Sequence, residues 1–411
     1  MLQKFETINV SFLSSYPPRA CGIATFTEDL VKEIDKIASL YNPLVNTSVI
    51  AISDDLYIYD NKVIKEIDQF DKGSYKKLAK YLNDSDIELL IIQHEYGIFG
   101  GESGEFLLDL IYNLEIPVIS VLHTVLINPN EKQRYILKEL GRYSARVVTM
   151  AKNTIELLKN IYGIDERKIV HIPHGVPYTN YGDRETLKKE LGLEGKIVVS
   201  TFGLIGPGKG LEYGIEAIAK LKTEFPNILY LILGRTHPGI IKNEGESYRE
   251  KLLSLVEELK VKNNVVFVNR YLTQEEILKY LQASDIYLTP YLNREQAVSG
   301  TLSYALSCGR VIVSTAYRYA EELLADGRGI LIDFKDANGI YEGIREILKN
   351  ESKKREIERK AFEYGKNMWW NVVAEKYIKL FIEVIKETRV AHYRGWEEWN
   401  FSTPELSIYS D

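Results

Sequence analysis

The chain has 411 residues, which is long for a single hydrophobic core and predicts two domains of roughly 150–200 residues each. Apolar residues make up 45% of the sequence and charged residues 27%, a balance typical of water-soluble globular proteins. The net charge is 52 − 58 = −6, so the composition argues against a protein that tracks a nucleic-acid backbone.

The two cysteines, Cys21 and Cys308, have no metal-ligand spacing, and so low a number is typical of a reduced, cytoplasmic protein. The sequence begins without a basic stretch followed by an apolar one, and no apolar run approaches about 18 residues. We therefore expect neither a secretion signal nor a transmembrane segment.

Short apolar runs alternate with amphipathic stretches along the chain. In the first half, strands are predicted at residues 8–15, 87–94, 116–124, 146–151 and 168–177, and helices at 25–40 and 153–163. In the second half, strands are predicted at residues 196–203, 228–234, 264–270, 285–291, 310–316 and 329–334, with amphipathic helices between most of them. A polar stretch at 177–195 is the predicted linker. The pattern predicts two doubly wound, Rossmann-like α/β domains with a cleft between them.

Parallel sheets bind ligands where their strands end, so the residues at these ends are the candidate site. His94 and His123 each end or follow a buried run in the first half. His94 is followed by Glu95, which suggests acceptor binding, and His237 follows a run in the second half. For each histidine taken alone, a structural role is about as plausible as a functional one.

Residues 203–210, GLIGPGKG, differ by one residue from the P-loop pattern, because Gly210 stands where a Ser or Thr would hold magnesium. Lys209 still offers a cation, and the glycine backbone allows a phosphate to come close. The loop therefore suggests a phosphate site of another kind. The alternative is a glycine-rich turn with a surface lysine.

Ser299, Gly300 and Thr301 lead into a predicted helix, whose free N–H groups and dipole favour an anion. Thr301 is predicted either to bind a phosphate or only to cap this helix. Glu295 precedes the helix at the end of the run at 285–291.

The order and spacing of these motifs resemble the GT-B glycosyltransferases of family 4 along nearly the whole chain. The similar features are the glycine loop at Gly22, His123 at a strand end, and the segments 172–176, 203–210, 288–315 and 367–381. The resemblance implies a GT-B fold with a donor cleft between two domains. It also implies transfer of a hexosyl group from a nucleotide sugar, with retained configuration and without a metal or other cofactor.

The resemblance implies the following domain organisation. Residues 1–180 form the acceptor-side domain, completed by a C-terminal helix at about 368–390, residues 190–367 form the nucleotide-sugar-binding domain, and 391–411 form a tail. Trp396, Trp399 and Phe401 of this tail are expected to pack on the first domain or on another subunit.

The resemblance also assigns site residues. Glu295 and His123 are the expected catalytic residues, with no metal ligands. Residues expected to bind the donor diphosphate are Gly22, Gly203, Lys209, Gly210, Ser299, Gly300 and Thr301. Further contacts to donor or acceptor are expected from Arg235, His237, Arg294, His94 and Tyr304.

Two positions depart from the family pattern. Leu204 stands where the family usually has an arginine on the phosphates, and Arg235 or Arg294 could replace that cation. The second carboxylate of the family's acidic pair, which holds the ribose, falls on Ser303, or on Tyr304 when one inserted residue is allowed. Neither residue is a carboxylate.

Three functions follow from these observations. The first is a mannosyl or glucosyl transferase that uses GDP-mannose or a UDP-hexose and a sugar or other hydroxyl acceptor. The second is a sugar phosphorylase or a sugar-phosphate-dependent transferase on the same fold, which the missing carboxylate favours slightly. The third is a non-catalytic sugar-binding module. The sequence leaves the base, the sugar, the acceptor, the linkage and the oligomeric state open.

Overall fold

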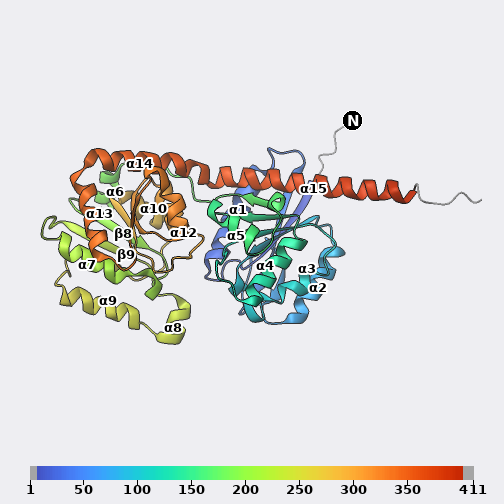
Figure 1. Ribbon diagram of the computed structural model, residues 1–411, viewed down its shortest axis with the longest axis horizontal. Coiled ribbons are helices and arrows are strands. Elements are labelled where there is room, and N and C mark those ends of the chain that lie inside the picture. The colour runs from blue at the N-terminus through green and yellow to red at the C-terminus, as the bar shows by residue number, and fades with distance from the viewer. Residues whose placement is uncertain (1–6, 401–411) are drawn as a thin grey trace, which may run out of the picture.

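The computed structural model describes residues 7–400, with side chains described for residues 7–390. The chain folds into two α/β domains, each built on a parallel sheet, and the C-terminal helix lies along the first of them (Figure 1). The predicted fold class is therefore confirmed. Residues 401–411, which include the tail residue Phe401, lie outside the described part of the chain, as do the side chains of Trp396 and Trp399.

The sheet of the first domain has seven parallel strands in the order β3-β2-β1-β4-β5-β6-β7. The strands are β1 (Thr7–Ser14), β2 (Leu44–Ser53), β3 (Val63–Asp68), β4 (Leu89–His94), β5 (Val118–Leu122), β6 (Arg146–Thr149) and β7 (Ile169–His171). The order reverses between β1 and β4, which is the point where doubly wound sheets bind ligands.

The sheet of the second domain has six parallel strands in the order β10-β9-β8-β11-β12-β13. The strands are β8 (Ile197–Phe202), β9 (Ile228–Leu233), β10 (Val265–Val268), β11 (Ile286–Thr289), β12 (Val311–Thr315) and β13 (Ile330–Ile332). Its order reverses between β8 and β11.

Helices cover both faces of each sheet. In the first domain they are α1 (Gly22–Ala38), α2 (Lys72–Asn83), α3 (Leu107–Ile111), α4 (Glu131–Tyr143) and α5 (Ile155–Asn160). The second domain contains α6 (Arg184–Glu190), α7 (Leu211–Leu221), α8 (Pro238–Glu244), α9 (Ser247–Glu258), α10 (Gln274–Ala283), α11 (Gly300–Ser307), α12 (Arg318–Leu323), α13 (Ala337–Lys349) and α14 (Glu351–Gly365). The last helix is α15 (Trp370–Asn400).

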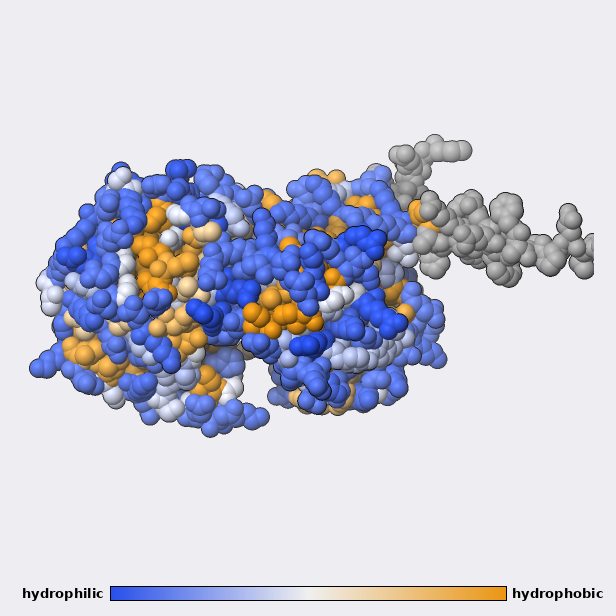
Figure 2. Space-filling view, viewed as in Figure 1, coloured by the Kyte–Doolittle hydropathy of each residue, from blue (hydrophilic) through white to orange (hydrophobic). Residues whose placement is uncertain are grey.

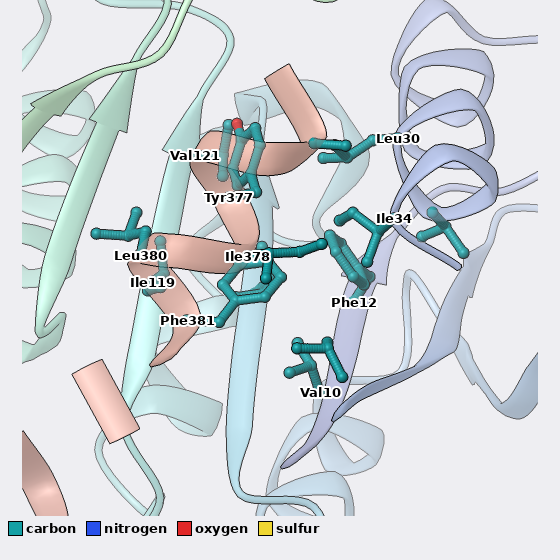
Figure 3. Close-up of a cluster of buried hydrophobic side chains, with 14 of the residues drawn as sticks. Val10, Phe12, Leu30, Ile34, Ile119, Val121, Tyr377, Ile378, Leu380 and Phe381 are labelled. Atoms are coloured by element: carbon teal, nitrogen blue, oxygen red, sulfur yellow. The ribbon is translucent and has the colours of Figure 1, made fainter. Parts of the chain in front are cut away.

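Helix α15 returns from the second domain and packs on the first (Figures 1 and 3). Its residues Tyr377, Ile378 and Phe381 enter the core between α1 and the sheet, where the ring of Phe381 meets that of Phe12 edge-on, with ring centroids 6.1 Å apart. Such an apolar stripe on a helix is stabilised mainly by burial. The helix extends to Asn400, about ten residues beyond the predicted end near 390.

Strands β2 and β3 and helices α2, α3, α4 and α6 were not predicted from the sequence. Strand β2 has Asn46, Thr47 and Ser48 near its start, so it is not a continuous apolar run, and β3 alternates polar and half-buried residues. Within the predicted linker at 177–195, α6 forms part of the second domain and packs against α10.

Candidate active site

A cavity of about 580 Å³ lies between the two domains and is lined by residues of both. The first domain contributes the start of α1 and the ends of β4 and β5, and the second contributes the loops after β8, β9 and β10 and the start of α11. A volume of this size is typical of small-molecule sites. Figure 2 shows a notch between the domains on the side opposite α15.

The start of α1 is open to this cavity. Cys21 precedes the helix in an extended conformation, and no side chain caps the helix at this position. Gly22 and Ile23 line the cavity. Because the first N–H groups of a helix have no partner within it, this end can donate to an anion.

The start of α11 faces the same cavity from the second domain. Ser299 caps the helix by accepting from the N–H of Leu302 at 3.3 Å, while Gly300 and Thr301 line the cavity. The hydroxyl of Thr301 is 2.9 Å from that of Tyr291. The cap is therefore Ser299, whose hydroxyl also lies 3.1 Å from that of Thr301.

The loop at 203–210 places one glycine at the cavity and another against the domain core. Gly203 lines the cavity with φ at 129°, a conformation that favours glycine. Gly210 has φ at 58°, and a Cβ there would lie 2.2 Å from the carbonyl oxygen of Pro290, so its role is structural.

Lys209 does not itself line the cavity. Its ammonium lies 3.8 Å from the centroid of the Tyr291 ring, a cation–π contact. The same ammonium would be 3.8 Å from a Cβ on Gly203, so it is close to the cavity wall.

His123 lines the cavity as predicted, with 8% of its surface exposed. Its Nε2 is 2.8 Å from Oε1 of Gln93, and because that oxygen only accepts, Nε2 carries the proton and Nδ1 is free to accept. Burial, with smaller effects from His174 and His94, lowers the pKa of His123 to about 3. The ring is therefore neutral near pH 7.

His174 also lines the cavity. Its Nδ1 is 2.7 Å from the carbonyl oxygen of Gly175, which leaves Nε2 as an acceptor. This Nε2 would be 3.1 Å from a Cβ on Gly300, so it lies beside the start of α11. Burial lowers the pKa of His174 to about 4.

His94, predicted to contact donor or acceptor, does not line the cavity. It is completely buried, and its ring stacks on Phe99 and meets Tyr96 edge-on. The next residue, Glu95, lines the cavity and accepts a hydrogen bond from Thr124. Burial raises the pKa of Glu95. Because it lies at the cavity, this carboxyl is a candidate hydrogen-bonding partner for sugar hydroxyls.

The structure places Glu295 beside the cavity wall and not in it. Its Oε2 lies 3.5 Å from Nη2 of Arg318, whereas the following residue, Gln296, lines the cavity. Glu295 follows a turn after β11 in which its N–H donates to Oδ1 of Asn293 at 3.1 Å. The catalytic role of Glu295 thus stays a prediction.

Two further predicted contacts lie away from the cavity. His237 is exposed, and its Nδ1 caps α8 by accepting from the N–H of Gly239. Arg294 is exposed and lies over the ring of Phe334. Neither side chain lines the cavity in this structure, so the two contacts stay predictions.

Arg235 does line the cavity, and its guanidinium lies 5.6 Å from the centroid of the Tyr271 ring. Leu204 lines it as well. Of the two arginines considered as replacements for the cation absent at Leu204, the geometry therefore favours Arg235.

At the position of the missing carboxylate, Tyr304 lines the cavity, whereas Ser303 is buried and bonds to the Tyr319 hydroxyl at 2.9 Å. The lining residues that were not predicted from the sequence include Asp29, His174 and Gln274. A carboxylate on an amphipathic helix and a glutamine at a helix start usually face solvent, so no sequence signal separates Asp29 and Gln274 from surface residues.

Within residues 7–390 no group of three His, Cys, Asp or Glu side chains is arranged to hold a metal ion. In the part of the chain that the structure describes, no helix is long and apolar enough to cross a membrane.

Residues 183–364, nearly the whole second domain, match the family model described as glycosyl transferases group 1. A phosphatidyl-myo-inositol mannosyltransferase of Mycolicibacterium smegmatis is 23% identical over 76% of this chain and 75% of its own length. An N-acetylgalactosaminyltransferase of Campylobacter jejuni that acts on a diphospho-undecaprenol substrate is 23% identical over 56% of this chain. That match spans only 57% of the Campylobacter protein.

Solved structures share the fold of the whole chain. Anabaena Alr3699/HepE, in complex with UDP and glucose, superposes with a TM-score of 0.71 at 16% identity, covering 92% of this chain and 100% of that one. Sucrose-phosphate synthase from Thermosynechococcus elongatus superposes with a TM-score of 0.74 at 15% identity over the same shares. Residues 183–364 thus match the glycosyl transferases group 1 family, and the chain as a whole has the two-domain GT-B fold of these solved structures.

Proposed function

We propose that the chain is a family 4-type hexosyltransferase that moves a mannosyl or glucosyl group from a nucleotide sugar to a hydroxyl of a sugar or other acceptor, with retention. The observation that carries the proposal is the cavity between the domains, into which two helix starts, those of α1 and α11, open from opposite sides. Two sets of free N–H groups facing one cavity suit a diphosphate.

In this proposal the protein stabilises the leaving group. The bond between the anomeric carbon and the diphosphate oxygen breaks, and negative charge grows on the diphosphate. The N–H groups at Gly22 and Gly300, the hydroxyl of Thr301 and the cations of Lys209 and Arg235 are the groups placed to stabilise that charge. The acceptor oxygen then bonds to the anomeric carbon and gives its proton to the leaving diphosphate.

Neutral hydrogen-bonding groups suit the sugar side of the cavity. His123 and His174 each present an unprotonated ring nitrogen, and Glu95 with Thr124 lies at the end of β4 and β5. We propose that His123 accepts from a hydroxyl of the transferred sugar and that Glu95 contacts the acceptor. The relatives suggest either GDP-mannose or a UDP-hexose as donor, since one is named a mannosyltransferase and another holds UDP and glucose. The low cysteine content suggests that the reaction takes place in the cytoplasm.

A second candidate function is a sugar phosphorylase or a transferase that uses a sugar phosphate. Tyr304 supports it, because this residue lines the cavity where the family pattern has a carboxylate for the ribose. A donor without a nucleoside needs no such contact.

Thermal shift with UDP, GDP, ADP and inorganic phosphate separates the two functions. A stabilisation by one nucleoside diphosphate well above that by phosphate supports the nucleotide-sugar transferase, and a response to phosphate alone supports the phosphorylase. A screen for donor hydrolysis over a panel of nucleotide sugars then names the base and the sugar. Absence of turnover with every donor, despite binding, would leave a sugar-binding module.

A further inference from the structure

Three side chains from both domains form a continuous hydrogen-bonded chain in the wall of the cavity. The amide Nε2 of Gln274, the first residue of α10, donates to Oδ2 of Asp29 at 2.9 Å and to the hydroxyl of Tyr304 at 3.0 Å. Asp29 lies on α1 of the first domain, and Tyr304 lies on α11 of the second. All three residues line the cavity.

Tyr304 lies one helical turn after Thr301 on α11. Both residues line the cavity, as does the loop after β10. That loop lines the cavity with Arg270, Tyr271 and Leu272. A nucleoside whose diphosphate is held at the start of α11 would therefore place its ribose near Tyr304. Asp29 is the carboxylate joined to this position by the hydrogen-bonded chain.

Asp29 is kept in the cavity wall at a cost. Burial is the main cause that raises the pKa of Asp29 to about 6, and the charge of Glu28 raises it further. Hydrogen bonds from Gln274 and Trp370 and the charge of Lys32 lower this pKa. A surface carboxylate on α1 would avoid this cost. Sites where a side chain is held against its own stability are frequently functional.

We propose that Asp29 supplies, across the cleft, the carboxylate for the donor ribose that α11 lacks, with Tyr304 as the second ribose contact and Gln274 as the bridge that positions both. The inference rests on the proposed use of a nucleotide donor. Ribose hydroxyls are donors that need acceptors, and a carboxylate is the stronger acceptor of the two side chains. Because Asp29 belongs to the first domain, a bound ribose joins the two domains and favours the closed cleft.

The test compares each nucleoside diphosphate with its 2′-deoxy and 3′-deoxy forms by calorimetry. The probes are UDP, GDP and ADP, and the proteins are the full chain, Asp29→Asn and Tyr304→Phe. We expect the wild-type chain to bind the ribose form of its preferred nucleotide about tenfold or more tightly than one of the deoxy forms. In Asp29→Asn this preference should fall below about threefold, with affinity for that deoxy form nearly unchanged.

The control is Glu33→Gln, which changes a carboxylate one turn further along α1, where Glu33 pairs with Lys36 outside the cavity. This variant should keep the ribose preference. If Asp29 only tied the domains together, Asp29→Asn would weaken ribose and deoxy forms equally, and that result would overturn the inference. An unchanged preference in both cavity variants would also overturn it while leaving the nucleotide-sugar function intact. Failure of every nucleoside diphosphate to bind the wild-type chain would instead remove the proposed function and the ribose site with it.

Discussion

The sequence predicts that the ammonium of Lys209 binds the donor diphosphate. The structure places that ammonium over the Tyr291 ring and near Gly203, within the loop that borders the cavity. A charge-assisted contact to a phosphate is worth roughly 1.5–3 kcal/mol. Lys209→Ala should therefore lower donor affinity or turnover at least about tenfold, measured by steady-state kinetics.

The matched control for this change is Lys220→Ala, on the exposed side of α7, where the ammonium donates to the Asn338 side chain at 3.3 Å. It should leave the kinetics unchanged. Kinetics equal to wild type in the Lys209 variant, with a normal melting temperature, would show that the loop is only a turn.

Asp29 makes stability depend on pH in a direction opposite to most carboxyl groups. Its pKa rises from 3.8 to about 6 on folding, mainly through burial, so the favourable neutral form is fully present below about pH 3.8 and is lost as pH rises through about 6. The groups that face it are Gln274, Glu28, Lys32, Trp370 and Tyr304. Two pKa units correspond to about 3 kcal/mol, which is an upper bound here.

Replacement of Asp29 by Asn removes the charge and keeps an acceptor for Gln274. We therefore expect Asp29→Asn to raise the melting temperature at pH 8 and to change it little at pH 4. A shift of equal size at both pH values would mean that the carboxylate is not destabilised by its surroundings.

Glu295 and Gln296 allow adjacent residues to be compared. Glu295 was predicted from the family pattern to stabilise the transition state, but its carboxylate faces Arg318, and the neighbouring Gln296 lines the cavity. If the predicted role holds, Glu295→Gln lowers turnover by about 10²-fold with little change in nucleotide affinity. A near-normal rate for that variant, together with a large loss in Gln296→Leu, would assign the contact to Gln296.

Among the site residues, sequence patterns identified those on loops and helix starts whose order along the chain is informative. Gly22, Gly203, Gly300 and His123 all line the cavity. Asp29 and Gln274 could not be found in this way, because what makes them part of the site is the approach of one domain to the other. That approach leaves no local signal in the sequence.

At the scale of the elements, completely buried strands were readily predicted. Strands β4, β9 and β12 are buried along their whole length. Strand β9 is a continuous apolar run, β4 is apolar up to Ile92, and β12 is apolar up to Val313. Strand β2 was missed because polar residues occur near its start, and β3 because as an edge strand it is only partly buried. The sequence pattern therefore recovers strands with apolar runs, including the edge strands β7, β10 and β13, and misses strands that begin with or alternate polar residues.

Gly175, near the end of the first domain, allows the chain to lie directly against Trp370 at the start of α15. A Cβ on Gly175 would lie 2.0 Å from Cε3 and Cζ3 of Trp370, and the adjacent Val176 pairs with the start of α15 through backbone bonds of 2.8 Å to Met368 and Trp370. Trp370 is part of the core of the first domain. Gly175→Ala should therefore displace Trp370 and destabilise the chain by about 1–3 kcal/mol, measured by urea unfolding.

Gly97→Ala is the matched control, because a Cβ at Gly97 would meet no atom within 4 Å. Its stability should stay within about 0.5 kcal/mol of wild type. Equal stability of both variants would show that α15 shifts freely at this point and is not fixed by the fit of Trp370 on Gly175.

For the whole molecule, the two-domain architecture followed from length and from the alternation of strands and helices, whereas the cavity's chemistry required both domains together. Around this cavity the groups suited to a diphosphate are the N–H groups of two helix starts, Lys209 and Arg235, which come from both halves of the chain. The described residues 7–390 offer no cluster of three metal-ligating side chains to replace these groups. We therefore expect turnover with a nucleotide-sugar donor to continue at an unchanged rate after dialysis against EDTA.

The measurement is the rate of nucleoside diphosphate release with EDTA, with added Mg²⁺ and with added Mn²⁺. Because helix N–H groups and side-chain cations bear no exchangeable ion, the three rates should agree within about twofold. A rate that falls to background with EDTA and returns only with a divalent ion would show that the diphosphate is held by a metal and would contradict the account of the donor site given above.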